Sequence, residues 1–554
     1  MVRRAKGSFD LNPHPMNPVR EFRTLSQSYL EAYWTLSPQS ASEVGLHQYD
    51  GELGENDARV WKSYGQLGDE TLRAIEALPD AAFVGDDWLD RRGFLSMLRT
   101  SAHWLNDLQR WRNNPQVHCD AAINSIFHLL TRYADELPKI RPAIESRLSK
   151  IPRFLAQGAA CLRSPVPLWT RLARKSCDGA EPFLRDVGEQ LATLSPAPDQ
   201  TRRLVRDAIS AFQKYAVAVE SKEPGPVDGY AIGQTAFDFL LREKTGLSYS
   251  LPEVRALGED LVLKLSAELR VEARKHGRKK AGELIEEAAA GWKPSAGSLL
   301  EEYQRVTGEI RGRFEAAGVV TFPKGEKCRV MLVPEFLRHQ FPTAAYSQPG
   351  CYDRDQTGIF WVNDLSVTHT DPAKQAAEVR QHFGLEFTCA HEAYPGHHLQ
   401  FVVQNQHPSK LRRLFAHAIF YEGWTLWCEK MAVDQGVIAI PEARLIQLHD
   451  ALWRAHRIGI DCGLHDGALT FNGACRKLQD GVGFTAARAR GDVNWYTSAP
   501  TVPLSYLLGR LEVERLHAQL VHREGWSLHQ FNDWMLGHGA IPWRWIWDAR
   551  LRPA

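Results

Sequence analysis

The sequence predicts a mostly α-helical protein of two lobes, with a small β insert beside its candidate functional site. Three observations support this fold class. Apolar residues recur at helical spacing between residues 18 and 278, short β-branched runs occur only within 319–362, and helical patterns resume in 371–536. We therefore expect an N-terminal helical lobe, 1–318, and a catalytic lobe, 319–554, which could also form one continuous bilobed domain.

The N-terminal lobe is expected to be a series of amphipathic helices. The segment 18–36 shows the pattern clearly, because Phe22, Leu25 and Tyr29 lie close to helical spacing. Polar or proline-rich joints such as 221–228 separate the helices. The other helices predicted in this lobe are 86–112, 120–136, 140–162, 199–219 and a stretch from 251 past 278.

The β insert and the helices after it complete the expected order of elements. Runs rich in β-branched and aromatic residues predict strands at 319–322, 328–333 and 358–362. Asp371 before Pro372 predicts a helix N-terminus, from which one helix should run to about His398. The remaining predicted helices are 410–435, 441–465, 485–490, 503–523 and 528–536.

Composition excludes several classes of protein. The 67 basic and 66 acidic residues give a net charge of +1, so there is no electrostatic argument for a nucleic-acid or membrane-surface partner. The nine cysteines form no CxxC pair, which argues against a disulfide framework or a zinc finger and favours a reducing compartment. The N-terminus has no apolar stretch after its basic residues, and no window of about 18 apolar residues exists. We expect a cytoplasmic protein.

The segment His391-Glu392-Ala393-Tyr394-Pro395-Gly396-His397-His398 carries the strongest chemical signal. Two histidines on one helix face can bind a divalent metal, and an adjacent glutamate can act as general base. The six-residue step from His391 to His397 turns about 240° around a regular helix, and the seven-residue step to His398 separates Cα atoms by roughly 10 Å. Pro395 and Gly396 predict a kink or bulge. If that distortion absorbs two residues, His397 becomes the second ligand and His398 a substrate contact; the opposite assignment stays open.

A third ligand is expected from another helix. Glu422 and Glu429 lie seven residues apart, on one face of a helix rich in bulky apolar groups. A carboxylate in such surroundings needs a partner, and a metal ion is a strong one. We predict Glu422 as a ligand and Glu429 as an outer residue that orients the ligands; a salt bridge or a solvated edge is the alternative.

Two further helices carry polar residues at helical spacing. Arg457, Asp461 and His465 form a stripe in which His465 is the candidate catalytic or orienting group, with a buried ion-pair network as the alternative. Tyr506 and Arg510 share another helix face. A tyrosine hydroxyl can stabilise an oxyanion and an arginine can hold a carboxylate, although such a pair is more often structural.

The sequence is identified as a member of the DUF885 family, a bacterial group of helical proteins with metallopeptidase-like character. The likeness covers nearly the whole chain. Its carrying segments are HEAYPGHHLQ at 391–400, YEGWTLWCE at 421–429, RIGIDCGLH at 457–465 and PLSYLLGR at 503–510, with YWTLSPQSASEVGLHQYD at 33–50, INSIFHLLTR at 123–132 and IGQTAFDFLLR at 232–242. The resemblance implies a large bilobed, helical, metallopeptidase-like fold.

More distantly, the segment is similar to helical zinc carboxypeptidases and oligopeptidases that carry His-Glu-x-Gly-His and a glutamate on the next helix. Here two residues are inserted. This resemblance implies that His391, His397 and Glu422 bind zinc and that Glu392 activates water. The candidates for transition-state stabilisation are Tyr506 and His465.

The expected function is metal-dependent hydrolysis of a peptide or amide bond, with Glu392 as the base. The expected substrate is a small peptide or an amide-containing small molecule, whose terminal carboxylate Arg510 or Arg457 would hold. A strand of the β insert could line the cleft, where Tyr346, in the loop before Pro349, could face the substrate. The alternatives are a metal-dependent biosynthetic enzyme (amide hydrolysis, acyl or aminoacyl transfer, or a lyase step) and a non-catalytic binding protein with a degenerate site.

Overall fold

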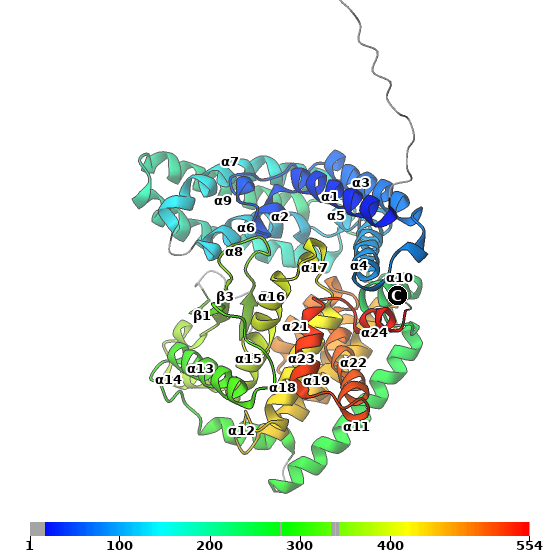
Figure 1. Ribbon diagram of the computed structural model, residues 1–554. Helices are drawn as coiled ribbons and strands as arrows, with labels where there is room; N and C mark the ends of the chain where they lie inside the picture. The colour runs from blue at the N-terminus through cyan, green and yellow to red at the C-terminus, as the bar shows by residue number, and fades with distance from the viewer. Residues whose placement is uncertain (1–16, 134–135, 278–279, 334–337, 339–342, 553–554) are drawn as a thin grey trace, which may run out of the picture.

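The computed structural model describes residues 17–133, 136–277, 280–333, 338 and 343–552. Within them the mostly α fold with a small sheet is confirmed (Figure 1). The N-terminal helices form a layer along one side of the molecule, drawn at the top of Figure 1. They include α1 (Pro18–Leu36), α3 (Ala58–Glu76), α6 (Gln116–Arg132), α7 (Leu137–Cys161), α8 (Pro167–Leu194) and α9 (Pro198–Glu220).

The C-terminal half packs below this layer, with the sheet between the two (Figure 1). Helix α11 (Leu251–Lys275) comes from the first half of the chain but packs along α19 of the second. The main helices of this half are α13 (Leu299–Ala317), α14 (Pro372–Arg380), α15 (Leu385–Glu392), α16 (His397–Asn405), α18 (Ala418–Asp434), α19 (Ala443–His465), α22 (Val502–His517), α23 (Leu528–Gly537) and α24 (Trp543–Leu551).

Local chemistry explains where several helices begin and end. Asn17 caps α1 by accepting a hydrogen bond from the Val19 backbone N–H, and Pro18 occupies the first helical position. Ser298 and Glu301 form a capping box at the start of α13, which ends at Gly318 in the left-handed conformation. These are the terminal signals that make helix positions readable from sequence.

The sheet has three strands in the order β1 (Lys327–Leu332), β3 (Thr357–Val362), β2 (Ala344–Ser347). β1 pairs with β3 in parallel and β2 pairs with β3 antiparallel. The prediction of a loop around Tyr346 is wrong, because this residue lies in β2. The strand predicted at 319–322 is also wrong, because its backbone pairs with α23 instead of with a strand. The Asn532 side chain donates to the Val319 carbonyl at 2.8 Å, and the Thr321 N–H donates to Asp533 at 2.9 Å.

The prediction of one helix from residue 371 to His398 is wrong. The segment forms α14, α15 and α16, in place of a single kinked helix. Gly384 adopts a left-handed conformation, φ +78°, and separates the first two helices. Residues 393–396 separate α15 from α16. This break places the ends of two helices side by side, which a continuous helix could not do.

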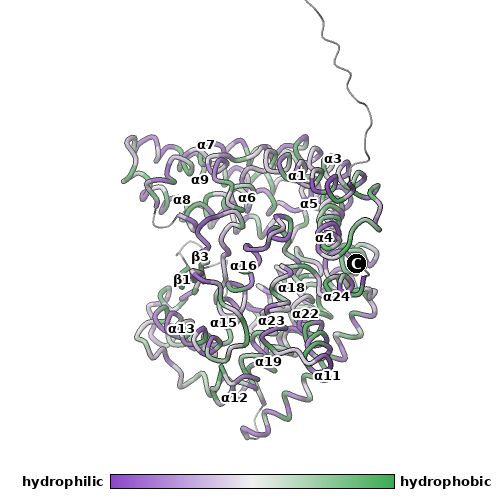
Figure 2. Tube along the Cα trace, in the orientation of Figure 1, coloured by the Kyte–Doolittle hydropathy of each residue, from purple (hydrophilic) through white to green (hydrophobic). Residues whose placement is uncertain are grey.

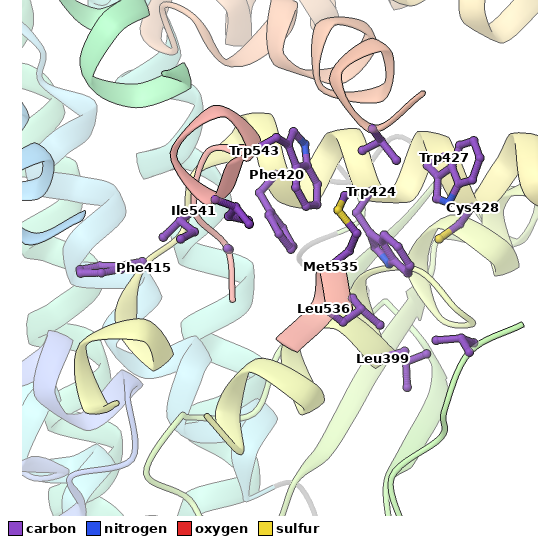
Figure 3. Packing of buried hydrophobic residues seen from close by; sticks show 14 of the residues in the cluster. Leu399, Phe415, Phe420, Trp424, Trp427, Cys428, Met535, Leu536, Ile541 and Trp543 are labelled. Atoms are coloured by element: carbon purple, nitrogen blue, oxygen red, sulfur yellow. The ribbon is translucent and has the colours of Figure 1, made fainter. Parts of the chain in front are cut away.

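A large apolar core supports the helices that carry the candidate site. Figure 3 shows Phe420, Trp424 and Trp427 of α18 packed against residues of α16, α23 and α24. The ring of Phe420 stacks on that of Trp543 with centroids 3.8 Å apart. Hydrophobic and hydrophilic residues alternate along the helices (Figure 2), and no helix of the described residues is long and apolar enough to cross a membrane.

Candidate metal centre

Three side chains from three helices converge at the break between α15 and α16. His391 lies near the end of α15, His397 is the first residue of α16, and Glu422 lies on α18. One ligand atom from each lies within 4.8 Å of the other two. The Nε2 atoms of both histidines are 3.6 Å from the same carboxylate oxygen, Oε2 of Glu422. The sequence predicts a kink that brings His397 close to His391. A break between two helices achieves the same approach.

The donor set fits a divalent cation of zinc's chemistry. A separation of 3.6 Å is too long for a hydrogen bond, and the buried Oε2 of Glu422 has no hydrogen-bond partner. With metal–ligand bonds of about 2.0–2.1 Å, neighbouring ligand atoms around a tetrahedral ion lie roughly 3.4 Å apart. The three atoms are spaced as ligands of one ion would be, and a buried, unpaired carboxylate oxygen is costly without a cation.

The loop 393–396 sets the crossing of the two helix ends. Only glycine fits at position 396, because a Cβ there would lie 1.8 Å from the His391 carbonyl oxygen. Its neighbour Pro395 accepts a hydrogen bond of 2.8 Å from the Trp424 indole. The position of Glu422 depends on a second close contact, between the backbones of two helices. Helix α18 meets α22 at Gly423 and Gly509, where a Cβ on Gly509 would lie 2.2 Å from the Ile419 carbonyl oxygen.

A second carboxylate orients His391 from behind. Glu429 accepts a hydrogen bond of 2.8 Å from Nδ1–H of His391, which leaves the Nε2 lone pair directed toward Glu422. The Arg454 guanidinium lies 3.7 Å from Glu429 and offsets its charge. Although burial opposes the change, the nearby Glu422 carboxylate and the hydrogen-bonded Glu429 carboxylate raise the pKa of His391 to about 10. The field at this point therefore favours positive charge, as a cation site requires.

Glu392 and Tyr506 complete the group at the cavity wall. Burial, together with the charges of Glu422 and Glu429, raises the pKa of Glu392 to about 7. The ring of Tyr506 lies nearly parallel to that of His391, with centroids 6.4 Å apart. Burial and the neighbouring Glu422 carboxylate raise the pKa of the Tyr506 hydroxyl, which keeps it protonated as a hydrogen-bond donor.

These residues line a cavity of about 1020 Å³ between the N-terminal layer and the C-terminal half. His391, Glu392, His397, Glu422 and Tyr506 are all in its lining. Strand β2 forms one wall, and residues of α6 such as Arg132 face it from the N-terminal layer. Among the described residues, the backbone of β2 pairs only with β3, so its other edge is open.

Several residues singled out from the sequence lie elsewhere. His398 is fully buried and contacts Glu326 at 2.7 Å and Tyr346 at 2.9 Å, so it does not reach the cavity. The reason is that it follows His397 on α16 and points to the other side of the helix. Asp461, His465, Arg457 and Arg510 are buried and outside the lining.

The stripe on α19 has structural contacts. Asp461 accepts hydrogen bonds from the Thr501 and Leu504 backbone N–H groups, both at 3.4 Å, at the start of α22. His465 faces the Tyr496 carbonyl at 3.1 Å. The Arg457 guanidinium lies 4.5 Å from the ring centroid of Tyr506, so that ring stands between it and the cavity residues that it would need to contact.

Two residues near the centre were not singled out from the sequence. Glu326 precedes β1 in a polar loop, where no spacing or motif distinguishes it from a surface residue. Arg413 lies on the short helix α17 (Lys410–Leu414) and lines the cavity. Its neighbour Arg412 is buried and pairs with Asp90 at 2.7 Å. Nothing in the sequence indicates which of these two adjacent arginines faces the cavity.

A family model described as "Bacterial protein of unknown function (DUF885)" matches residues 38–548. A solved "putative lipoprotein of unknown function" from Shewanella oneidensis is similar with a TM-score of 0.73 at 19% identity, covering 96% of this chain and 100% of that one. A "putative lipoprotein" from Colwellia psychrerythraea is similar with a TM-score of 0.76 at 18% identity, covering 96% and 98%. No curated protein matches the chain. At these identities the two structures show a shared fold.

Proposed function

We propose that this chain, which belongs to the DUF885 family, is a metal-dependent hydrolase that cleaves an amide bond in short, extended peptides. One observation carries the proposal. The buried Oε2 of Glu422 has no hydrogen-bond partner and lies 3.6 Å from two histidine Nε2 atoms, at a cavity that Glu392 also lines. Two imidazoles and one carboxylate are a ligand set of catalytic zinc sites.

His391, His397 and Glu422 would hold the cation, which would polarise the scissile carbonyl and acidify water. Glu392 lies beside the first ligand and lines the cavity, so it is placed to accept the proton of the attacking water and to pass it to the leaving amine nitrogen. The Tyr506 ring packs beside His391 and lines the cavity, and its hydroxyl would donate to the oxyanion. The Glu429 carboxylate keeps His391 in the tautomer that presents Nε2.

The open edge of β2 supports a peptide as substrate. Ala344–Ser347 line the cavity together with the three ligands, and their backbone groups on that side have no partner among the described residues. An extended peptide can add to such an edge through main-chain hydrogen bonds. The N-terminal layer covers the cavity, whose size is at the upper end of that usual for small ligands, and this favours short chains over folded proteins.

Arg413 lines the cavity and is our candidate for the group that holds a substrate carboxylate. Its Nε donates to the His407 carbonyl at 2.6 Å, and no carboxylate among the described residues pairs with its guanidinium. Arg132, on the same cavity wall, is already paired with Asp353 at 3.0 Å. Arg413 therefore replaces Arg510 and Arg457 in this role, because those two lie outside the lining.

The test is hydrolysis of a panel of short unmodified peptides, followed by mass spectrometry. The chain is treated with chelator and then reconstituted with Zn²⁺. We expect cleavage only after reconstitution. Turnover that is indifferent to chelator, or a zinc-loaded chain that cleaves no peptide of the panel, would contradict the proposal.

Backbone pairing with β2 has its own test. Peptides of one cleaved sequence are N-methylated at successive positions on one side of the cut. Strand addition predicts that kcat/KM falls at alternate positions only, because alternate N–H groups face the strand. An equal fall in kcat/KM at every position, or no fall, would contradict backbone pairing between the substrate and β2.

A further inference from the structure

Glu326 is a buried carboxylate that binds both sides of the loop between the two candidate histidine ligands. Its side chain is 1% exposed. Oε2 accepts hydrogen bonds of 2.7 Å from the Tyr394 hydroxyl and 2.7 Å from Nε2–H of His398. Oε1 accepts from Arg311 at 3.0 Å. These bonds hold the pKa of Glu326 below its usual value in spite of burial, so it remains charged.

One of these contacts is made from within the segment that separates the candidate ligands, and the other from the residue just after the second ligand. Tyr394 comes three residues after His391, and His398 directly follows His397. The backbone here is irregular, with Ala393, just before Tyr394, at φ −110°, ψ −82° and Gly396, two residues before His398, at φ −68°, ψ −136°. The backbone hydrogen bonds of this loop run to α15 on one side and to α16 on the other, and none within the part of the chain that the structure describes joins the two helices directly across it. Its side-chain tethers are Glu326 on one side and Trp424 on the other.

His398 extends the same network to the cavity wall. With Nε2–H donated to Glu326, Nδ1 of His398 accepts from the Tyr346 hydroxyl at 2.9 Å. Tyr346 lies on β2, and a Cβ on the facing Gly358 would lie 2.0 Å from its hydroxyl oxygen. The first turn of α16 is thus held against the sheet through His398, and His397 is carried with it.

We propose that Glu326 is a positioning residue that sets the separation of His391 and His397 and thereby the affinity of the site for its cation. The inference rests on the proposed metal centre. Metal sites tolerate ligand displacements of only a few tenths of an ångström, and substitution of residues that orient ligands typically lowers metal affinity by about 10- to 100-fold. Glu326 reaches the ligands only through Tyr394 and His398, so it acts through geometry.

The test is the zinc affinity of the full chain, measured by calorimetry on chelator-treated protein, for Glu326→Gln and its control. Arg311 keeps a partner in this variant, because it also pairs with Glu315 at 3.0 Å. Glu302→Gln is the matched control. Glu302 is a buried carboxylate that accepts from Arg305 at 2.6 Å and from Ser295 and Ala296, none of which belongs to the loop.

We expect Glu326→Gln to raise the Kd for Zn²⁺ by about 10- to 100-fold and Glu302→Gln to leave it within about twofold. The melting temperature of the metal-free protein, taken in parallel, measures general destabilisation. An unchanged Kd in Glu326→Gln, or an equal increase in both variants, would overturn the inference while the metal centre stands. A wild-type chain that binds no zinc would overturn the proposed function and this inference with it.

A second pair of variants decides the matter if Glu326→Gln does not fold. Tyr394→Phe removes one hydroxyl from the network, and Tyr215→Phe removes a buried hydroxyl that donates to the Pro115 carbonyl at the same 2.7 Å distance, remote from the loop. Weaker zinc binding in Tyr394→Phe alone supports the inference. Equal binding in the two variants contradicts it.

Discussion

The break between α15 and α16 and the polar stripe on α19 are both clusters of charged groups buried in helices, but their groups face different partners. In the stripe, Asp461 accepts from backbone N–H groups and His465 faces a carbonyl oxygen. At the break, the ligand atoms face one another at 3.6 Å, without hydrogen bonds, in the lining of a cavity. The first arrangement joins α19 to the start of α22, whereas in the second the three side chains line a cavity.

The comparison teaches that polarity on a helix face does not identify a site. In the sequence both clusters combine histidine with carboxylate residues on predicted helices. Two differences separate them. Backbone N–H groups bond to the Asp461 carboxylate, whereas Oε2 of Glu422 has no hydrogen-bond partner, and only the residues at the break line the cavity. The variants below treat the two clusters in parallel, so that each result either sharpens or breaks the distinction.

The largest effect is expected for Glu392→Gln. Loss of the base should lower kcat by about 10²- to 10⁴-fold, because the amide cannot accept the proton of water. Zinc binding should persist, since Glu392 is not among the three ligands. Glu386→Gln, on the same helix, is the control and should keep its activity. Retained activity in Glu392→Gln would remove this residue from the mechanism.

A smaller loss is expected for Tyr506→Phe. Removal of one oxyanion donor should lower kcat by about 10²-fold with little change in zinc affinity. Tyr496→Phe deletes a buried hydroxyl on α21 (Ala486–Ser498), next to the stripe, where it accepts from Arg457 at 2.8 Å and donates to Asp492 at 2.6 Å. This control should lower the melting temperature and leave kcat unchanged. Equal kinetic losses in both variants would erase the difference between the two clusters.

Arg413→Met should change substrate preference by about tenfold. The ratio of kcat/KM for a peptide with a free C-terminus to that for its C-terminal amide should fall, because one charge-assisted contact is lost. Arg510→Met, which alters a buried arginine outside the cavity, should leave that ratio unchanged. A change of the ratio in Arg510→Met alone would restore the role that the sequence suggested for Arg510.

The smallest effect, on stability alone, is expected for Asp461→Asn. Burial raises the pKa of Asp461 well above its ordinary value in the folded chain, so the neutral carboxyl favours folding below the unfolded pKa of about 3.9. That contribution is lost as the pH rises toward the folded pKa. The amide of the Asp461→Asn variant is neutral at every pH. The wild-type melting temperature minus that of this variant should therefore fall as the pH rises from about 4. Zinc affinity should not differ. A constant difference across pH would mean that Asp461 is ionised when folded.

Sequence patterns predicted helices well where their ends carry local signals. The segment 18–36 matches α1, because Asn17 and Pro18 mark its start and its apolar residues repeat at 3.6. Helix α19 (Ala443–His465) likewise lies within two residues of the predicted 441–465. The strand at 319–322 failed because β-branched residues predict extended backbone but not its partner, which here is α23.

The candidate site was predictable only in part. The residue types and the Pro395-Gly396 step indicated that His391, His397 and Glu422 could converge, and the structure brings them together; their role as ligands stays a prediction. Glu326 could not be found, because its contacts to Tyr394 and His398 span 68 and 72 residues of sequence and follow no period. Arg413 was missed for a related reason, since which of two adjacent arginines faces the cavity depends on tertiary packing.

The central claim is that the break between α15 and α16 is a cation site, and a zinc titration of wild type and Glu422→Gln tests it most directly. Calorimetry on chelator-treated chain should show one Zn²⁺ bound per wild-type chain. In Glu422→Gln the affinity should fall by at least about 10²-fold, because an amide oxygen replaces the charged ligand. No binding by the wild-type chain, or equal binding by the two proteins, would contradict the account.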